Sequence, residues 1–558
     1  MDRFRRGAAT GVRRNLDDPE ALHRWSVEEP EEFWGLLFDE LLPSVDRNGA
    51  ALVGREGAAF GVDWFPGTLL NAAEAILSGN VAGDPAVDEA VMFVSIDERG
   101  RRREVTRAHA RAEVAAIAAA LRAEGVGEGD RVAVWLPNTD VAMLVMLAAA
   151  SIGAVFSSTS PDFGVDGVLD RFTQIEPAVL VAADGYTYGG RDFDRRGQLA
   201  EIMGGLPTVR TTVVVGFLEP APDLAELEEF GHAVDFGAWV SPHEGAKPQY
   251  AQLPFDHPWY VLFSSGTTGV PKCIVHRTGG VLLQHLKEHQ LHCDIGPGDQ
   301  VCYFTTCGWM MWNWLASVPA SGATAVLYEG NPFHPGPQRL WEVAEAESLT
   351  FLGVSAKYVD AVLKAGYRPV DSVDLSALRT VASTGSPLSP ESFDWLYEAV
   401  SPGCAEGGLH VASISGGTDL CGCFVGGDPT RPVYSGEIQG PALGMAVDVW
   451  DTDGNPAAPA VRGELVCTGP FPSTPLGFWG DGPLGAIGPR YSGAYFERFE
   501  GVWAHGDFAS WTDHGGMVIH GRSDTTLNPG GVRIGTAEIY RQVEQIPAVL
   551  ESLVFGQE

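Results

Sequence analysis

A short loop between residues 263 and 272 carries the densest group of residues that could bind an anion. Its sequence, FSSGTTGVPK, ends an apolar run from Tyr260 to Phe263 that predicts a buried strand. Glycines let the backbone turn with its N–H groups pointing inward, hydroxyls add donors and a lysine adds positive charge. Charge-assisted hydrogen bonds contribute about 1.5–3 kcal/mol each, so a few of them can orient a triphosphate. The candidate donors are Ser264, Ser265, Gly266, Thr267, Thr268, Gly269 and Lys272.

This loop does not establish nucleotide binding by itself. It departs from the GxxxxGK[ST] phosphate loop, and no helix begins at its lysine in the residue pattern. A polar glycine-rich turn without a ligand has the same composition and is commoner. Other segments of the chain have to decide between the two interpretations.

Five segments in a fixed order resemble the AMP-forming adenylating superfamily of acyl-CoA ligases. The loop with the CIVHRTGG that follows it is similar to the superfamily's phosphate-binding signature. WFPGTLLNAAEAIL at 64–77 is also similar to the N-terminal segment of its acetyl-CoA synthetase branch, so the resemblance covers most of the chain. It implies that a carboxylate attacks the α-phosphate of MgATP to give an acyl-adenylate, and that a thiol then displaces AMP. The other segments are ASTGSPL at 382–388, SISGGTDL at 413–420, WAHGDFA at 503–509 and IHGRSDTTLNPGGVRIGTAEI at 519–539.

The resemblance implies four catalytic residues, Thr267, Lys272, Thr418 and Asp419. Thr418 stands where the superfamily has a threonine that touches the α-phosphate, and Asp419 where it has a glutamate that places Mg²⁺. The aspartate is one methylene shorter but offers the same carboxylate oxygens to a hard cation. An aspartate after Gly-Gly-Thr ordinarily makes an Asx-type turn, and the order of the motifs argues against that role here.

The remaining nucleotide contacts are also implied by the resemblance. Asp507 corresponds to a ribose ligand, whose two oxygens match a cis-diol, and Arg522 to a second ribose contact. Arg533 corresponds to an arginine that faces phosphates in the acetyl-CoA synthetase branch. In isolation, Asp507 after a glycine would indicate only a turn, and Arg533 would indicate solvated surface. The adenine-side segment comprises Gly385, Ser386 and Pro387, with Gly417 beside the catalytic threonine.

For coenzyme A, the resemblance implies contacts on both sides of a hinge at Asp524. An arginine cluster around Arg191 would supply charge for the CoA phosphates, although such clusters are usually solvated surface and this alternative stays open. The predicted anchors are Phe163, Gly164, Arg191, Gly530 and Gly531.

Two differences from acetate-activating enzymes concern the pocket for the carboxylic acid substrate. Gly416 stands where those enzymes have a tryptophan, which predicts space for a longer acid. CGWMMWNW at 307–314 and GVSAKYV at 353–359 resemble the acetoacetate-activating branch, and this implies acetoacetate as the acid with Trp309 and Met310 in its pocket. A stripe of Trp and Met is also typical of simple core. Butyrate, 3-hydroxybutyrate and propionate stay open as alternative acids.

The composition narrows the class of protein. The chain has 558 residues, of which 45% are hydrophobic, enough for more than one domain. Its net charge of −35 repels nucleic acid and anionic membranes, so an anionic ligand needs locally placed cations. Eight cysteines without CxxC pairs and an N-terminus without an apolar segment predict a cytoplasmic protein without disulfides or structural zinc. We expect small-molecule partners only, and the oligomeric state is not predicted.

The elements that must position these residues are predicted to be α/β. An amphipathic helix over 107–124, with Thr106 as its N-cap and Gly125 at its end, precedes a strand at 131–136 and a buried apolar helix that ends near Gly153. The same alternation continues to residue 183 and returns between 274 and 400, which predicts two doubly wound subdomains. Short β-rich pieces after residue 425 predict a small β-barrel or sandwich.

The predicted organisation is one large N-terminal domain and the start of a second. Residues 1–425 hold the α/β subdomains, with an N-terminal extension at 1–80, and residues 426–523 hold the β-rich subdomain. Residues 524–558 are too few to bury a core, which predicts a truncated α+β C-terminal domain. No lysine follows Lys364, whereas members of the superfamily carry an adenylation lysine near their C-terminus. A catalytically impaired adenylate-binding protein is therefore the non-enzyme alternative.

Overall fold

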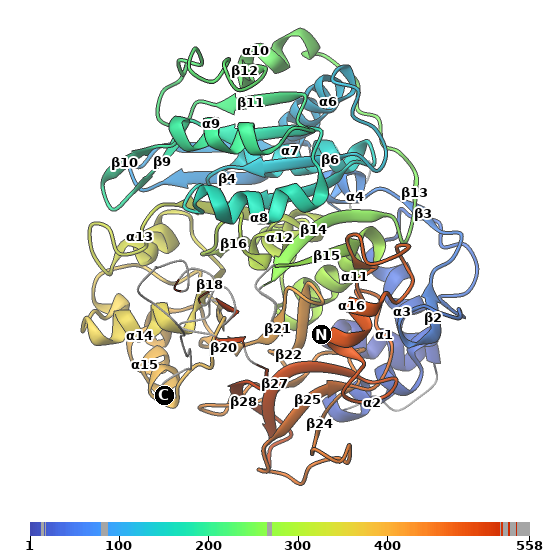
Figure 1. Ribbon diagram of the computed structural model, residues 1–558. Coiled ribbons are helices and arrows are strands. Elements are labelled where there is room, and N and C mark those ends of the chain that lie inside the picture. Colours follow the sequence, from blue (N-terminus) through green and yellow to red (C-terminus); the bar gives the residue numbers. More distant parts are fainter. Residues whose placement is uncertain are drawn as a thin grey trace.

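Two large and mostly parallel sheets form the centre of the molecule in the computed structural model (Figure 1). The structure describes residues 1–12, 16, 18–79, 88–264, 271–524, 526–527, 534–535, 539 and 543. Strands and helices alternate along most of this length. The prediction of an α/β protein with two doubly wound subdomains is therefore confirmed.

The first sheet has eight strands in the order β12-β11-β8-β6-β7-β14-β15-β26. The pairs from β12 to β14 are parallel, whereas β15 pairs antiparallel with β14 and β26 antiparallel with β15. The strand predicted before the glycine-rich loop is β14, and β15 begins at Lys272 after it. The strands are β6 (Arg131–Trp135), β7 (Val155–Thr159), β8 (Val179–Ala183), β11 (Thr211–Val215), β12 (Ala233–Asp235), β14 (Pro258–Ser264), β15 (Lys272–Arg277) and β26 (Gly477–Phe478).

The second sheet has seven strands in the order β20-β19-β18-β16-β17-β4-β5. All of its pairs are parallel except the last, β4 with β5. Two of its strands, β4 and β5, precede the first subdomain in the chain, so this sheet is larger than the 274–400 pattern indicates. The strands are β4 (Val91–Asp97), β5 (Arg102–Thr106), β16 (Gln300–Tyr303), β17 (Thr324–Glu329), β18 (Phe351–Ser355), β19 (Thr380–Thr384) and β20 (His410–Ser413).

Helices cover both faces of each sheet. Along β6, Val132 and Val134 pack into an apolar cluster shared with the second sheet, whereas Ala133 and Trp135 face the opposite side. The shared cluster also contains α6 (Arg107–Ala123), α7 (Asp140–Ser151), α11 (Thr278–Lys287) and α12 (Met310–Ala316). The outer faces are covered by α8 (Val165–Ile175) and α9 (Arg196–Gly205) on the first sheet, and by α13 (Arg339–Ala346), α14 (Ala356–Lys364) and α15 (Pro390–Ala399) on the second.

The two helices with the clearest sequence signals form as predicted. The Thr106 side chain caps α6 by accepting a hydrogen bond from His109 N, and Gly125 follows the helix with a φ of 74°. Helix α7 is apolar on nearly all sides because it lies in the cluster shared by both sheets. Gly153, with a φ of 78°, turns the chain from α7 into β7.

The β-rich part consists of two small antiparallel sheets that share one apolar cluster. The four-stranded sheet has the open order β24-β25-β27-β28, and a bridge from Ile438 to Met517 connects it to the three-stranded sheet β21-β22-β23. Of the two expected forms, barrel and sandwich, the arrangement is therefore the small sandwich, because the four-stranded sheet is open. Its elements are β21 (Ser415–Gly417), β22 (Gly422–Gly426), β23 (Gly440–Pro441), β24 (Val447–Trp450), β25 (Gly463–Cys467), β27 (Trp503–Trp511), β28 (Met517–Arg522) and the helix α16 (Pro489–Tyr495).

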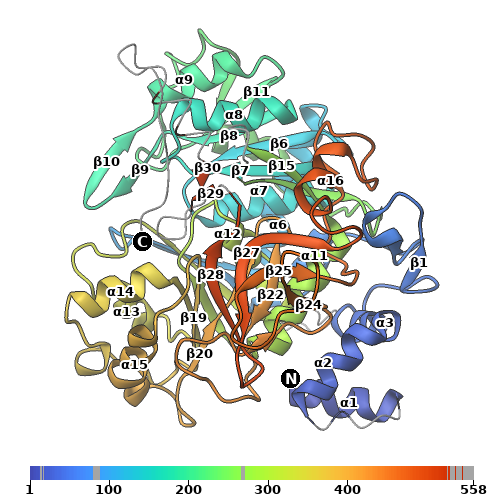
Figure 2. The same cartoon turned by 60° about the horizontal axis from the view of Figure 1, so that its bottom comes forward.

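The N-terminal extension packs against this β-rich part. Helices α1 (Asp2–Val12), α2 (Pro19–Glu28) and α3 (Pro30–Leu41) lie together at one side of the molecule (Figure 2). The His23 ring nitrogen lies 3.0 Å from the Met445 carbonyl oxygen, and Gly444 N donates to Ser26 Oγ at 2.8 Å. The extension is thus held to residues more than four hundred positions away.

The predicted C-terminal elements fall mainly outside the described residues. Most of the segment 524–558, where a truncated α+β domain was predicted, lies there. Within it, β29 (Thr526–Leu527) pairs antiparallel with β30 (Ile534–Gly535). The domain boundaries at 425 and 524 stay predictions.

Candidate active site

A cavity of about 600 Å³ lies at the carboxyl ends of strands from both large sheets. Thr159 ends β7 and Ser264 ends β14, whereas Thr384 and Ser413 end β19 and β20 of the second sheet, and all four line the cavity. Ligands of open α/β sheets bind beyond the carboxyl ends of parallel strands, because the loops there leave a crevice. The fold therefore favours this cavity as the functional site.

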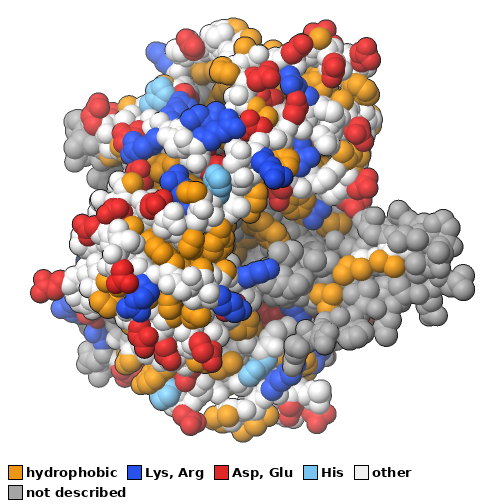
Figure 3. All heavy atoms as spheres, turned by 90° about the vertical axis from the view of Figure 1, so that its left-hand side faces the viewer, with side chains coloured by type: hydrophobic (Ala, Val, Ile, Leu, Met, Phe, Trp, Pro, Cys, Tyr) orange, Lys and Arg blue, Asp and Glu red, His pale blue; other side chains and the backbone are white. Residues whose placement is uncertain are grey.

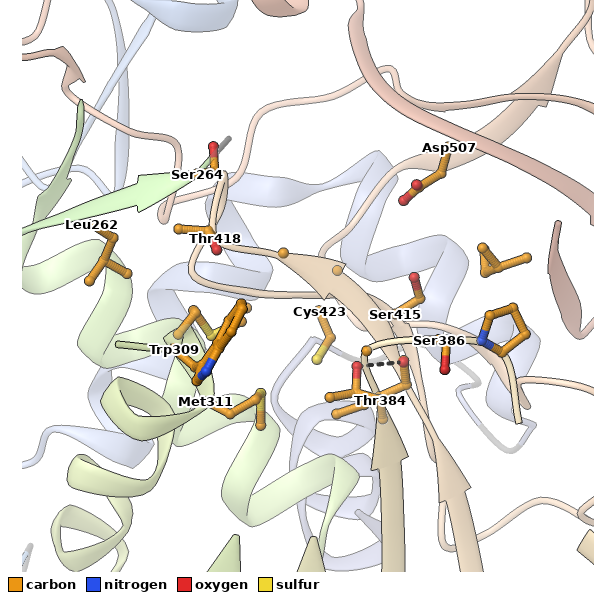
Figure 4. Close-up of a pocket in the computed structure, with 18 of the residues that line it drawn as sticks. Leu262, Ser264, Trp309, Met311, Thr384, Ser386, Ser415, Thr418, Cys423 and Asp507 are labelled. Carbon is orange, nitrogen blue, oxygen red and sulfur yellow. Dashed lines mark hydrogen bonds between the residues drawn. The ribbon is translucent and has the colours of Figure 1, made fainter. Parts of the chain in front are cut away.

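Most of the described candidate residues come together in this cavity. In Figure 4, Trp309, Met311 and Thr418 lie on one side, Ser386 and Asp507 on the other, and Cys423 between them. These residues belong to motifs that are far apart in the sequence. The predicted residues that line the cavity are Phe163, Ser264, Trp309, Met310, Gly385, Ser386, Pro387, Gly416, Gly417, Thr418 and Asp507.

Lys272 and Asp419 lie beside the cavity as an ion pair. Lys272 Nζ is 3.5 Å from Asp419 Oδ1, and the Tyr495 hydroxyl donates to the same oxygen at 2.5 Å. The Lys272 ammonium also lies 5.0 Å from the centre of the Tyr495 ring. Asp419 is only 2% exposed, so its charge needs these partners. We call Lys272, Asp419 and Tyr495 the charged cluster.

The two predicted ribose residues contact each other on β27 and β28. Arg522 Nη1 donates to Asp507 Oδ1 at 3.2 Å, and Arg522 Nε donates to Asp524 Oδ1 at 3.1 Å. Burial lowers the pKa of Arg522, but the two carboxylates outweigh it and raise that pKa above its ordinary value. The guanidinium therefore stays charged and links the ribose candidate Asp507 to the predicted hinge residue.

Helix α12 forms one wall of the cavity and is held from behind by two buried carboxylates. We call Trp309, Met310 and Met311 the α12 wall. Trp314 Nε1 donates to Glu288 Oε2 at 2.9 Å, and Trp312 Nε1 donates to Asn138 Oδ1 at 3.1 Å. Asn138 N in turn donates to Glu329 Oε2 at 2.6 Å.

The two carboxylates behind the wall are held by neutral groups. Glu288 Oε1 accepts hydrogen bonds from Cys423 N and from Gln284 Nε2, both at 2.7 Å. Burial raises the pKa of Glu288 above its ordinary value and raises the pKa of Glu329 to about 7. Glu288 thus ties the α12 wall to β22, which also lines the cavity.

Gly416 lines the cavity, but its role differs from the one expected. A Cβ atom added to Gly416 would lie 2.0 Å from the Gly422 carbonyl oxygen and 2.6 Å from Cys423 Cα. The close pairing of β21 with β22 therefore requires a glycine, and a side chain there would meet backbone instead of filling the cavity. The expectation that an absent side chain at 416 enlarges the acid pocket is wrong for this backbone.

The candidate CoA residues are only partly placed. Phe163 lines the cavity and Gly164 is the N-cap residue of α8 next to it, whereas Arg191 begins the hairpin strand β10 (Arg191–Asp194), is exposed and does not line the cavity. Figure 3 shows the face that lies at the left of Figure 1. Lys and Arg side chains gather on its upper part, although the net charge of the chain is negative. The residues Ser265, Gly266, Thr267, Thr268, Gly269, Gly530, Gly531 and Arg533 lie outside the described residues.

Several cavity residues carried no recognised sequence signal. The Arg171 guanidinium on α8 lies 4.8 Å from the centre of the Phe163 ring, and Nη1 donates to Gly167 O at 2.7 Å. Its spacing from Phe163, eight residues along the chain, gives no pattern by itself. Other lining residues without such a signal are Asp162, Cys423, Ile438 and Met517, whereas Thr384 and Met311 lie in quoted motifs but were not singled out.

The donor set near the cavity suits a magnesium ion that arrives with a nucleotide. No group of three His, Cys, Asp or Glu side chains that could hold a metal occurs among the described residues. Mg²⁺ commonly takes one or two carboxylates and completes its shell with phosphate oxygens and water. Asp419 offers such a carboxylate, so the residues fit Mg²⁺ bound together with ATP.

Two further observations concern residues beyond the cavity. All eight cysteines lie in the described part and are free thiols, as predicted. Within the described residues, no helix is long and apolar enough to cross a membrane.

Comparisons with known proteins agree with the geometry. The family described as AMP-binding enzyme matches residues 80–479. Acetoacetyl-coenzyme A synthetase of Rhizobium meliloti (strain 1021) is 49% identical and covers 98% of this chain and 80% of its own. Acetoacetyl-CoA synthetase of Macaca fascicularis is 42% identical over 100% of this chain and 81% of its own. The solved acetoacetyl-CoA synthetase from Streptomyces lividans superposes with a TM-score of 0.86 at 45% identity, over 100% of this chain and 83% of that one.

Proposed function

This chain belongs to the AMP-binding enzyme family, and from that premise we propose that it is an acetoacetate:CoA ligase that forms acetoacetyl-AMP from MgATP. The observation that carries the proposal is the cavity itself. It joins the adenine-side Ser386 and the ribose candidate Asp507 on one side with the phosphate-side Thr418 and the α12 wall on the other. Nucleotide and acid would therefore meet near Thr418.

The first half-reaction needs charges that meet a polyanion. The acid's carboxylate approaches the α-phosphate, and negative charge on the phosphate oxygens grows as pyrophosphate leaves. Lys272 and the Thr418 hydroxyl would donate to these oxygens, and Thr267 would join them from the loop. Mg²⁺ held by Asp419 would supply neutralising charge on the phosphates.

The remaining contacts orient the nucleotide and the acid. Asp507 would accept both ribose hydroxyls, with Arg522 fixing its carboxylate at 3.2 Å. The Gly385–Pro387 turn would lie beside adenine, and the α12 wall would enclose the acid. Such positioning is a large part of adenylate formation, because it aligns the two reactants before reaction.

In the second half-reaction the CoA thiol would attack the acyl carbon and displace AMP. Phe163 and Arg171 line the cavity on the α8 side and would flank the pantetheine arm. Arg191 lies outside the cavity on an exposed hairpin, where it would meet CoA phosphates. Asp524 would be the hinge between the two half-reactions.

The proposal is tested by product analysis. The purified chain is incubated with acetoacetate, ATP, Mg²⁺ and CoA, and nucleotides and thioesters are separated by chromatography. We expect acetoacetyl-CoA and AMP to depend on all four reactants, and pyrophosphate to depend on acetoacetate, ATP and Mg²⁺. Formation of ADP would contradict the proposal. So would the absence of acetoacetate-dependent exchange of pyrophosphate into ATP.

The acid is tested separately. Butyrate, 3-hydroxybutyrate and propionate are compared with acetoacetate by kcat/KM. We expect acetoacetate to rank first, because α12 wall segments resemble the acetoacetate-activating branch. A higher kcat/KM for another acid would leave the ligase chemistry intact and reassign the substrate.

A further inference from the structure

Tyr495 contacts both charged residues of the phosphate side, yet it belongs to none of the motifs. Its hydroxyl donates to Asp419 Oδ1 at 2.5 Å, while the face of its ring lies 5.0 Å from Lys272 Nζ. A cation over an aromatic face and a hydroxyl on a carboxylate are both favourable, and burial strengthens them. One side chain therefore holds the two opposite charges next to each other.

The ring of Tyr495 is itself held in one orientation. It stacks on Trp503 with ring centres 3.8 Å apart and an angle of 11°, and it packs edge-on against Phe478 at 5.8 Å. The side chain is only 2% exposed. Because the ring cannot turn freely, its hydroxyl keeps a fixed position relative to β27, which also carries the ribose candidate Asp507.

Under the proposed function, binding of MgATP would change the partners of Asp419. In the structure, Lys272 neutralises this carboxylate at 3.5 Å. Under the proposed function, Lys272 turns to the phosphates and Mg²⁺ takes its place at the carboxylate. A buried carboxylate without a partner is destabilised by desolvation. During the exchange, another hydrogen-bond donor must therefore stay with Asp419.

We propose that Tyr495 is a positioning residue that holds Asp419 in place while its cationic partner changes from Lys272 to Mg²⁺. This inference rests on the proposed function in that it takes the metal to arrive with ATP. The hydroxyl keeps one donor on Oδ1 throughout, so the carboxylate does not have to reorient when the ammonium leaves. The metal then binds a carboxylate that is already fixed.

Helix α16 provides a matched control, Tyr491. It lies one turn before Tyr495, is 1% exposed, and packs against both Tyr495 and Trp503. Its hydroxyl has no hydrogen-bond partner among the described residues. Tyr491→Phe therefore removes the same atom from the same helix without removing a hydrogen bond of the charged cluster.

The test measures how strongly Mg²⁺ aids nucleotide binding, without turnover. Binding of α,β-methylene-ATP is measured by titration calorimetry with Mg²⁺ and with EDTA, for the unmodified chain, Tyr495→Phe and Tyr491→Phe. Since a hydrogen bond to a charged group is worth about tenfold or more in affinity, Tyr495→Phe should reduce the Mg²⁺-dependent gain by about tenfold. Tyr491→Phe should keep the full gain, and all three proteins should bind alike in EDTA.

A double-mutant cycle with Asp419→Asn separates positioning from packing. In that background Tyr495→Phe should no longer change the Mg²⁺-dependent gain, because the carboxylate it serves is gone. An unchanged gain in Tyr495→Phe, an equal loss in Tyr491→Phe, or an undiminished effect beside Asp419→Asn would each overturn the inference. The assay contains no carboxylic acid substrate. The result therefore does not depend on whether the enzyme activates acetoacetate or another acid.

Discussion

The two sides of the cavity hold buried carboxylates in opposite ways. In the charged cluster, Asp419 is paired with a lysine, a partner that can exchange for a ligand. Behind the α12 wall, Glu288 and Glu329 accept hydrogen bonds from indole, amide and backbone N–H groups that belong to the fold. From this difference we expect the first carboxylate to serve binding and reaction, and the other two to hold the wall in place.

The strongest test of this contrast is Glu288→Ala. It would leave the Trp314 indole N–H, the Gln284 amide and Cys423 N without their acceptor, and the buried Lys287 without a neighbouring carboxylate. We expect the free energy of unfolding to fall by about 3–5 kcal/mol, measured in guanidinium. Glu288→Gln, which keeps one acceptor oxygen, should lose less. If Glu288→Ala were as stable as the unmodified chain, Glu288 would not have the structural role inferred here.

Asp419→Ala should reduce activity strongly and stability only slightly. Without this carboxylate, acetoacetate-dependent exchange of pyrophosphate into ATP should fall by about 100- to 1,000-fold, since a group that acts on developing charge is removed. The unfolding free energy should change much less than in Glu288→Ala. Asp371→Ala, at an exposed carboxylate paired with Arg368, is the control. If Asp419→Ala retained the pyrophosphate exchange activity, Asp419 would have no role in adenylate formation.

Glu329→Gln makes the contrast visible in pH dependence. The folded protein raises the pKa of Glu329 to about 7 from an ordinary value of 4.5, so the folded state keeps a proton that the unfolded state has lost. This residue's contribution to stability is therefore full below pH 4.5 and is lost as the pH rises to about 7, by about 3 kcal/mol.

Glutamine at 329 cannot titrate but can still accept from Asn138 N. The stability of Glu329→Gln relative to the unmodified chain should therefore rise between pH 5 and pH 8, as measured by denaturant unfolding at both values. Glu391→Gln, at an exposed position of α15, controls for the loss of one charge. A difference that does not vary with pH would contradict a protonated Glu329.

The smallest expected effect is that of Trp309→Ala, which changes the wall itself. Its indole is 38% exposed and lines the cavity, so its removal should cost little stability. We expect the KM for acetoacetate to rise by about tenfold and the KM for ATP to stay constant. Tyr397→Ala, at a residue that is 37% exposed and does not line the cavity, is the control. A parallel rise in the KM for ATP would place Trp309 beside the nucleotide instead.

Local patterns predicted individual elements well but not their partners. The helix over 107–124 is α6, and the apolar run that ends near Gly153 is α7, because helix period and end signals are contained in a short stretch. The pairing of β4 with β17, across more than two hundred residues, has no such local signal. The small sandwich was expected only as an alternative to a barrel, because sheet closure depends on which strands meet.

The same limit applies to the site. Motifs predicted Thr418, Asp419 and Asp507 as site residues because their types and order are visible in the chain. Nothing in the sequence around Tyr495 points to Lys272 or Asp419, since these contacts join segments 76 or more residues apart. The role of Gly416 was misjudged for a related reason: the space beside it depends on how closely β22 approaches β21.

By itself, the amino-acid sequence determined the strand and helix alternation, the order of the motifs and the chemistry of the side chains available to a nucleotide. These follow from residue type and spacing, which are local properties. Only the tertiary structure decided that two sheets share one cavity, that Lys272 pairs with Asp419 under Tyr495, and that buried glutamates support the α12 wall. Those arrangements depend on contacts between distant segments, whose free energy is set by packing and burial in three dimensions.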